Sequence, residues 1–189
     1  MSQRIPVDLA KAYRLLNHGP TVMVASAHAG RMNLMSAAWS MPLDFSPPKV
    51  AVVIDKSTLT RELVEASGEF VLCVPSREQA RLALQVGAAS GRELDKFAAH
   101  ELRYVPGSKV GAPLIEGCLG WLECRLIPEP HIQQAYDLFL GEVAAAWADP
   151  DAFEDGHWKP GQGGRRSIHY VAGGHFFETG EAFEIEGIR

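Results

Sequence analysis

The fold of this chain is decided by the run Thr21-Val22-Met23-Val24-Ala25-Ser26-Ala27. A turn follows at residues 28–31, and two more apolar runs cover residues 32–41 and 50–54, separated by Ser46-Pro47-Pro48. Runs rich in β-branched residues between Gly and Pro signals are typical of strands joined by turns. The region therefore predicts a meander of antiparallel strands.

Helix-end signals predict short helices on both sides of this meander. Asp8 is a plausible N-cap for a helix over residues 9–16. Ser57 or Thr58 can cap a second helix over residues 59–66, which we expect to stop at Gly68.

A third helix is predicted by the S-x-x-Q capping box of Ser76 and Gln79, and we expect it to cover residues 79–86 and end at Gly87.

About six or seven strands with a few helices between them fit a closed antiparallel barrel with peripheral helices. A doubly wound sheet would instead alternate strands and helices regularly. Further strands are expected over residues 69–74, 117–128, 137–148 and 167–177, with an extended loop over 149–166.

Length and charge narrow the classes of function. The chain has 189 residues, with 18 Lys and Arg against 23 Asp and Glu and a formal net charge of −5. This length predicts one domain over residues 1–189. An acidic chain lacks the clustered cations of a general nucleic-acid surface, but it remains compatible with one small anionic ligand.

The cysteines and the apolar runs predict a cytoplasmic protein. Cys73, Cys118 and Cys124 lie in apolar surroundings, which is typical of buried reduced thiols. No uninterrupted apolar run approaches the roughly 18 residues that cross a bilayer. We therefore expect a soluble cytoplasmic protein with no disulfide framework and no membrane partner.

Several common catalytic and cofactor motifs are missing from the sequence. No G-x-G-x-x-G follows a strand, no Gly-rich loop ends in G-K-[ST], and no G-x-S-x-G occurs. Rossmann-type dinucleotide binding, P-loop phosphate binding and the commonest serine-hydrolase chemistry are therefore disfavoured. The seven His and three Cys show no metal-ligand spacing, so we expect no metal site.

Small side chains predict a place where a flat ligand can approach the backbone. Residues 33–43 are rich in Ala and Ser, and Ser36 and Ser40 add hydroxyl groups that can address polar ring edges. A plain small-residue strand packed on another strand would show the same pattern. Both interpretations remain open at this point.

Two further segments carry charge next to turn or cap signals. Residues 50–62 run from an apolar strand into a hydroxyl-rich helix start beside Lys56, which suits a phosphate. An ordinary N-cap with a nearby lysine has the same pattern. In residues 90–97, Lys96 either reaches a ligand edge or pairs with a neighbouring carboxylate.

A series of motifs occurs in one order along the chain. They are Pro20-Thr21-Val22-Met23-Val24, Asn33-Leu34-Met35-Ser36-Ala37-Ala38-Trp39, Ser46-Pro47-Pro48, Lys56-Ser57-Thr58-Leu59-Thr60, Gly68-Glu69-Phe70-Val71-Leu72-Cys73-Val74-Pro75, Ser90-Gly91-Arg92, Asp95-Lys96-Phe97 and Leu138-Phe139-Leu140-Gly141-Glu142-Val143. This series resembles the flavin reductase-like, FMN-binding split-barrel family, and within it the flavoredoxin-type branch. The resemblance covers about residues 10–180 and implies a mainly β, Greek-key-like split barrel with its core there and a few peripheral helices.

The resemblance also implies non-covalent FMN and a homodimer. Residues 33 and 35–39 would line the isoalloxazine and ribityl side, the hydroxyl-rich helix start would hold the phosphate, and Lys96 would approach the flavin ring. No side chain is assigned a catalytic role, since the chemistry would be that of the flavin. The implied cofactor-binding residues are Asn33, Met35, Ser36, Ala37, Ala38, Trp39, Asp55, Lys56, Ser57, Thr58, Thr60 and Lys96.

Two positions depart from the family pattern. Lys56 stands where the family often has Arg, which keeps the charge but loses a bidentate fork. Cys73 stands where Asn is common, which removes one polar contact.

The resemblance implies an FMN-dependent oxidoreductase that takes hydride or electrons from NAD(P)H or from a protein donor. A protein that carries electrons on FMN without its own NAD(P)H reaction is the nearest alternative. A split-barrel binding module with another cofactor, such as haem, is a third, although His169 and His175 give no convincing axial ligand.

Overall fold

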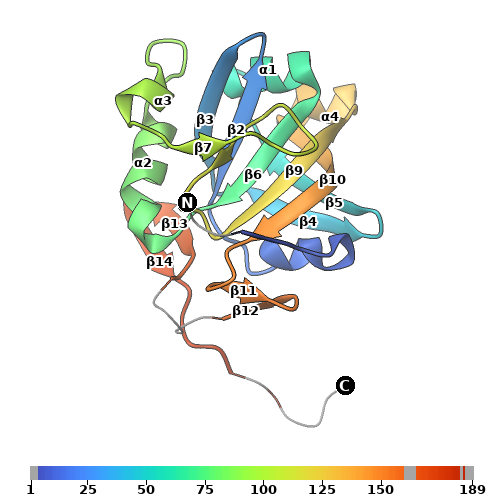
Figure 1. The fold of residues 1–189 in the computed structure, drawn as a ribbon. Helices are drawn as coiled ribbons and strands as arrows, with labels where there is room; N and C mark the ends of the chain where they lie inside the picture. Colours follow the sequence, from blue (N-terminus) through green and yellow to red (C-terminus); the bar gives the residue numbers. More distant parts are fainter. Residues whose placement is uncertain (1–3, 160–164, 184, 186–189) are drawn as a thin grey trace.

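The fold is organised by one antiparallel sheet of eight strands. The computed structural model describes residues 4–159, 165–183 and 185. Along the sheet the order is β3-β2-β6-β9-β10-β5-β4, and β1 (Ile5–Pro6) pairs with β10 (Figure 1). The seven longer strands are β2 (Val22–His28), β3 (Arg31–Ala37), β4 (Ser40–Phe45), β5 (Pro48–Val53), β6 (Glu69–Val74), β9 (Gly120–Ile127) and β10 (Leu138–Ala148).

The two ends of this sheet, β3 and β4, do not pair with each other, so the sheet is open. The split barrel is confirmed, and the fully closed barrel that the strand count favoured is wrong. The reason is a break at Ala38 and Trp39, where residues 32–41 divide into two strands instead of continuing as one. The Trp39 carbonyl accepts from Val53 N (3.0 Å), which turns the chain from β3 towards β5.

Three central strands are buried on both faces. On β2, Val22 and Val24 enter one apolar cluster, and Met23 and Ala25 enter a second cluster on the other face. The same alternation occurs on β6 and β9, because successive side chains of a strand point to opposite faces. Double-sided burial explains why the centres of β2 and β6 lack a polar–apolar alternation. On β9, Glu123 is the exception: it is fully buried, and its carboxylate accepts from Lys109 N and Trp147 Nε1.

Helices cover the faces and one end of the sheet. In Figure 1, α1 and α4 lie together at one end, and α2 lies along the side that carries β3. None of the helices in the described part of the chain is both long and apolar enough to cross a membrane. The helical elements are η1 (Leu9–Leu15), α1 (Leu59–Ser67), η2 (Arg77–Gln79), α2 (Ala80–Ala88), α3 (Lys96–Ala99) and α4 (Pro130–Tyr136).

Most of the predicted helix signals are confirmed. The Asp8 side chain accepts from Ala10 N, Thr58 Oγ1 accepts from Arg61 N, and Gly68 ends α1 with a φ of 71°. The Ser76–Gln79 capping box is present. These signals work because they depend on residues within one helical turn.

Several boundaries differ from the prediction. The first helix is a 3-10 helix, α2 continues through Gly87 to Ala88, and α4 was not predicted at all. The last β segment is a hairpin that turns at Gly173 and Gly174, which both have positive φ. The short hairpins pair β7 (Tyr104–Val105) with β8 (Leu114–Ile115), β11 (Phe153–Glu154) with β12 (His157–Trp158), and β13 (Ile168–Ala172) with β14 (His175–Glu178). The β11–β12 hairpin lies in the predicted loop, of which residues 160–164 are outside the described residues.

His18 joins the N-terminal helix to the two C-terminal hairpins. Its ring packs edge-on against Trp158 (centroids 4.8 Å apart) and His169 (5.6 Å), and its Nε2 lies 2.8 Å from Ser167 Oγ. Burial, with a smaller repulsion from His169, lowers the pKa of His18 from 6.5 to about 4. His18 is therefore neutral in the fold at neutral pH.

Acid should destabilise the protein through His18. Because its pKa falls from 6.5 unfolded to about 4 folded, the unfolded chain takes up a proton first and stability is lost as pH falls through this window. The loss from this residue should reach about 2 kcal/mol by pH ~4.5. Urea unfolding at pH 7 and 4.5 should show a smaller difference for His18→Gln than for wild type. The exposed His28→Gln is the control, and equal losses in all three proteins would contradict the assignment.

Candidate functional site

A pocket of about 670 Å³ lies where β3, α2, the end of α4 and the β13–β14 hairpin meet. Six predicted site residues are in its wall: five consecutive residues at the end of β3, and Asp55. The complete lining is Thr21, Met35, Ser36, Ala37, Ala38, Trp39, Val53, Asp55, Ala83, Leu84, Gly87, Ala88, Tyr136, Asp137, Tyr170, Val171 and Phe176. The part contributed by α2, α4 and the hairpin was not predicted, since it depends on contacts between distant segments.

Small residues bring β3 and α2 close together along this wall. Ser36 Oγ donates to the Ala83 carbonyl at 2.5 Å, so its hydroxyl is already used within the protein. A Cβ added at Gly87 would lie 3.3 Å from Ser36 Cβ, which is tight. Both interpretations of the small-residue segment therefore hold in part, because the segment packs against a neighbour and also lines the pocket.

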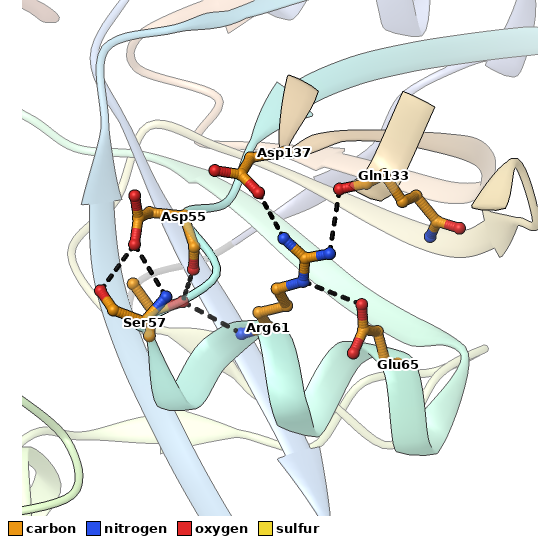
Figure 2. Close-up of polar contacts among 7 residues, drawn as sticks. Asp55, Ser57, Arg61, Glu65, Gln133 and Asp137 are labelled. Atoms are coloured by element: carbon orange, nitrogen blue, oxygen red, sulfur yellow. Dashed lines mark hydrogen bonds and ion pairs between the residues drawn. The ribbon is translucent and has the colours of Figure 1, made fainter. Parts of the chain in front are cut away.

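The turn from β5 into α1 is organised by Asp55. Its Oδ1 accepts from Ser57 N (2.8 Å) and from Ser57 Oγ (2.6 Å), and its carbonyl accepts from Thr58 Oγ1 (2.8 Å; Figure 2). The hydrogen bonds from Ser57 lower the pKa of the Asp55 carboxyl. Asp55 therefore both shapes this turn and belongs to the pocket lining.

Cationic side chains surround the first turns of α1. Lys56 is exposed, Arg92 Nε lies 3.5 Å from the Ser57 carbonyl, and Arg92 Nη1 pairs with Glu62 at 2.8 Å. Arg31 Nη1 approaches the same Glu62 carboxylate at 3.9 Å. Lys56 and Ser57 were predicted here, whereas Arg92 is brought to the turn from a segment that is 35 residues away in the sequence.

Asn33 and Thr60 bind each other outside the pocket lining. Asn33 Nδ2 donates to Thr60 Oγ1 at 2.8 Å, and both side chains are buried. A Cβ at Gly91 would come within 2.2 Å of Asn33 Oδ1, so only glycine fits there without a shift. This contact joins β3 to α1, and the predicted flavin contacts of both residues stay predictions.

Lys96 lies behind the pocket wall. It is 3% exposed, and its Nζ donates to the carbonyls of Leu34 (2.8 Å) and Val86 (2.6 Å). Burial lowers its pKa to about 8. Of the two alternatives for Lys96, pairing with a neighbouring carboxylate is not found, because its Nζ is bound to these carbonyls and Asp95 caps α3 through Phe97 N and Ala98 N. The predicted contact of Lys96 with the ring stays a prediction.

Arg61 joins α1 to α4 and to the pocket (Figure 2). Its Nη1 pairs with Asp137 Oδ1, its Nη2 donates to the Gln133 carbonyl at 2.9 Å, and its Nε donates to Glu65 Oε1 at 2.9 Å. The guanidinium carbon also lies 5.3 Å from the centroid of the Phe139 ring. Asp137 lines the pocket and Arg61 does not, so Arg61 holds part of the pocket wall in place from outside the lining.

The family model for the flavin reductase like domain matches residues 13–168. This chain belongs to the flavin reductase-like family. A solved FMN-binding domain of a flavin reductases-like enzyme from Shewanella baltica is 46% identical, covers 98% of both chains and superposes with a TM-score of 0.93. Flavoredoxin of Desulfovibrio vulgaris is 28% identical over 89% of this chain and 90% of its own, with a TM-score of 0.76. The Escherichia coli protein YddH is 44% identical and matches over 96% of this chain and 97% of its own length.

The family assignment fits the chemistry of the site. Across residues 4–159, 165–183 and 185 no group of three or more His, Cys, Asp or Glu side chains is placed to hold a metal ion. The pocket instead combines small residues, aromatic side chains and a nearby cationic turn. Pockets of this kind are suited to a planar organic cofactor that carries a phosphate.

Replacing Arg61 should lower stability and disturb the pocket together. Arg61→Met leaves the Asp137 carboxylate and the Gln133 carbonyl without their donor, which should cost about 3 kcal/mol of unfolding free energy. Arg61→Lys should have an unfolding free energy between those of the wild type and Arg61→Met, because an ammonium keeps the charge but not the two-pronged geometry of the guanidinium. Urea unfolding would measure this, with the exposed Arg81→Met on α2 as a control. A loss below about 1 kcal/mol for Arg61→Met would show that the network is dispensable.

Proposed function

We propose that this protein binds FMN non-covalently and acts as a flavin reductase- or flavoredoxin-type oxidoreductase that receives hydride or electrons from NAD(P)H or a protein donor. The proposal rests on one arrangement: the small-residue wall of β3 lies in the same pocket as Asp55, which leads directly into the cationic first turn of α1. A flat ring and a phosphate of one ligand find complementary surroundings there.

The residues present fit FMN. A phosphate at the α1 start would meet the positive end of the helix dipole and the charges of Lys56 and Arg92. The Ser57 hydroxyl would donate to it by giving up its hydrogen bond to Asp55 Oδ1. Ser40 is next to Trp39 in the chain but is not in the lining, and its Oγ is buried, so the ring contacts proposed at this end are those of residues 35–39.

FMN, when bound, supplies the hydride and electron chemistry. The protein's part is to hold the ring, to exclude water and to set the electrostatic field around it. The Lys96 ammonium binds the carbonyls of Leu34 and Val86, which are the chain neighbours of lining residues on β3 and α2. Its positive charge there would favour negative charge on the ring. No proton-transfer pair is required from the chain.

Electron carriage on FMN without an NAD(P)H reaction is the second candidate function, and one observation supports it. The pocket lining includes neither Lys nor Arg among the residues that the structure describes, so a dinucleotide pyrophosphate would find no partner within it.

The domain over residues 1–189 and a cytoplasmic location belong to the same proposal. In keeping with the latter, Cys73, Cys118 and Cys124 are buried free thiols.

An absorption spectrum of the purified protein after reconstitution with FMN tests the proposal. We expect a bound flavin spectrum, which anaerobic NADH or NADPH then bleaches. A flavin that stays oxidised with both nucleotides would support the carrier. Absence of bound flavin after reconstitution would refute FMN binding.

The phosphate site can be tested by removing a charge and a hydroxyl. Lys56→Ala with Ser57→Ala should weaken FMN binding by about tenfold or more, because charge-assisted hydrogen bonds to the phosphate are lost. Riboflavin, which lacks the phosphate, should bind both proteins equally in a fluorescence titration. Lys109→Ala, an exposed lysine elsewhere, is the control. Unchanged FMN affinity in the double variant would place the phosphate elsewhere, and an equal loss for both flavins would show that the substitutions act on the site without acting through the phosphate.

A homodimer is part of the proposal, and the β4 stripe supports it. We use this name for Met41, Leu43 and Phe45, whose side chains are 53%, 43% and 64% exposed on the last strand of the sheet. They alternate with more covered neighbours, so one face of β4 is apolar and faces solvent. Exposed apolar patches of this kind mark association sites. Trp39, 75% exposed, lies next to the stripe and also lines the pocket.

Charge placed on the β4 stripe should separate the dimer. Met41→Asp with Leu43→Asp should shift the mass from light scattering to that of one 20.6 kDa chain and weaken FMN binding, because the partner would cover Trp39. Phe177→Asp, an equally exposed aromatic on β14, is the control. A dimer that survives the double substitution would rule out this face.

A further inference from the structure

The apolar wall formed by Leu84, Tyr170, Val171 and Phe176 is left over when FMN is assigned its place in the pocket. Leu84 belongs to α2 and the others to the β13–β14 hairpin, and neither element carries a predicted FMN ligand. We name these four residues the hairpin wall. Leu84, Tyr170 and Val171 are 41%, 40% and 52% exposed, so the wall presents apolar surface to the pocket and to solvent.

The hairpin wall is held in place by contacts to the barrel. Tyr170 N donates to Thr21 Oγ1 at 2.7 Å, and Thr21 N donates to the Ile168 carbonyl at 2.8 Å. The Tyr170 and Phe176 rings pack edge to face with centroids 5.2 Å apart. Figure 1 shows the hairpin lying beneath α2. The wall is therefore preformed, which lowers the entropic cost of binding a ligand.

The charged residues of the pocket decide which class of ligand the hairpin wall can bind. The only charged residues in the described lining are carboxylates, Asp55 and Asp137. Both are already engaged, Asp55 with Ser57 and Asp137 with Arg61. An anionic group brought into this part of the pocket would lose water and gain no cation, which is costly. An uncharged ring would gain aromatic and apolar contacts.

We propose that the hairpin wall binds a second ligand beside the FMN, and that this ligand is an uncharged planar aromatic compound and not an anionic one. The proposal rests on the proposed function, because the wall is assigned to a second ligand only if FMN occupies the β3 side. It extends that function by naming the class of molecule that reaches the flavin.

A matched pair of probes tests the charge preference. 2-Naphthamide and 2-naphthoate have nearly the same shape and differ in charge. In calorimetric titrations of the FMN-loaded protein at pH 7, naphthamide should bind at least about tenfold more tightly than naphthoate. Equal or tighter binding of naphthoate, or no binding of either probe, would overturn the proposal.

Two substitutions locate the probe. Tyr170→Ala should weaken naphthamide binding about fivefold or more, whereas Phe177→Ala, on the same hairpin but outside the lining, should leave it unchanged. Val171→Lys, at a half-exposed position that tolerates a long side chain, should raise naphthoate affinity severalfold and change naphthamide affinity less than about twofold. Equal effects of Tyr170→Ala and Phe177→Ala, or no gain for naphthoate in Val171→Lys, would place the probe elsewhere.

FMN loading is read separately from the flavin spectrum of the same samples. A protein that retains FMN but binds no naphthamide would refute the second site and leave the proposed function intact. A protein that never retains FMN would refute the proposed function first.

Discussion

One buried guanidinium ties the fold of this protein to its pocket. Arg61 lies in the first turns of α1 and binds α4 at two points, the Gln133 carbonyl in the middle of the helix and the carboxylate of its C-cap residue Asp137. Asp137 adopts a left-handed backbone (φ 54°) and is followed at once by β10, the strand between β9 and β5. The position of α1 is thereby coupled to the start of β10, and the turn before α1 and the Asp137 corner bound the same pocket.

The pocket follows from the way in which the sheet stays open. β2, β6 and β9 need cover on both faces, so α2 and the β7–β8 region pack on one side while η1 and β10 fill the other. β3 and β4 are the two edge strands, and each is paired on one side only. The break at Ala38 and Trp39 carries the chain from β3 at one end of the sheet to β4 at the other, and the residues at this break line the pocket. The split in the barrel is therefore also the source of the site.

Local signals predicted much of this structure, and long-range contacts account for the rest. Asp8, Thr58 and Gly68 act within one turn of their helices, so the sequence pattern was sufficient for them. Gly87 carried a helix-stop signal, but α2 packs on β3 and continues past it. Lys96 was expected in a polar turn, yet two carbonyls from distant segments hold its ammonium in the interior. The hairpin wall was not foreseeable, because the hydrogen bond that places it joins Tyr170 and Thr21, which are 149 residues apart in the sequence.

The net charge of −5 is a poor guide to this site because the charges are sorted locally. Arg31, Lys56 and Arg92 surround the α1 start, whereas the charges that line the pocket itself are carboxylates held by Ser57 and Arg61. A ligand with a phosphate at one end and a flat ring at the other would be oriented by this separation before any specific ring contact formed. The same separation leaves the hairpin wall apolar and free of cations. Orientation of the cofactor and selection against anions beside it would then have one electrostatic origin.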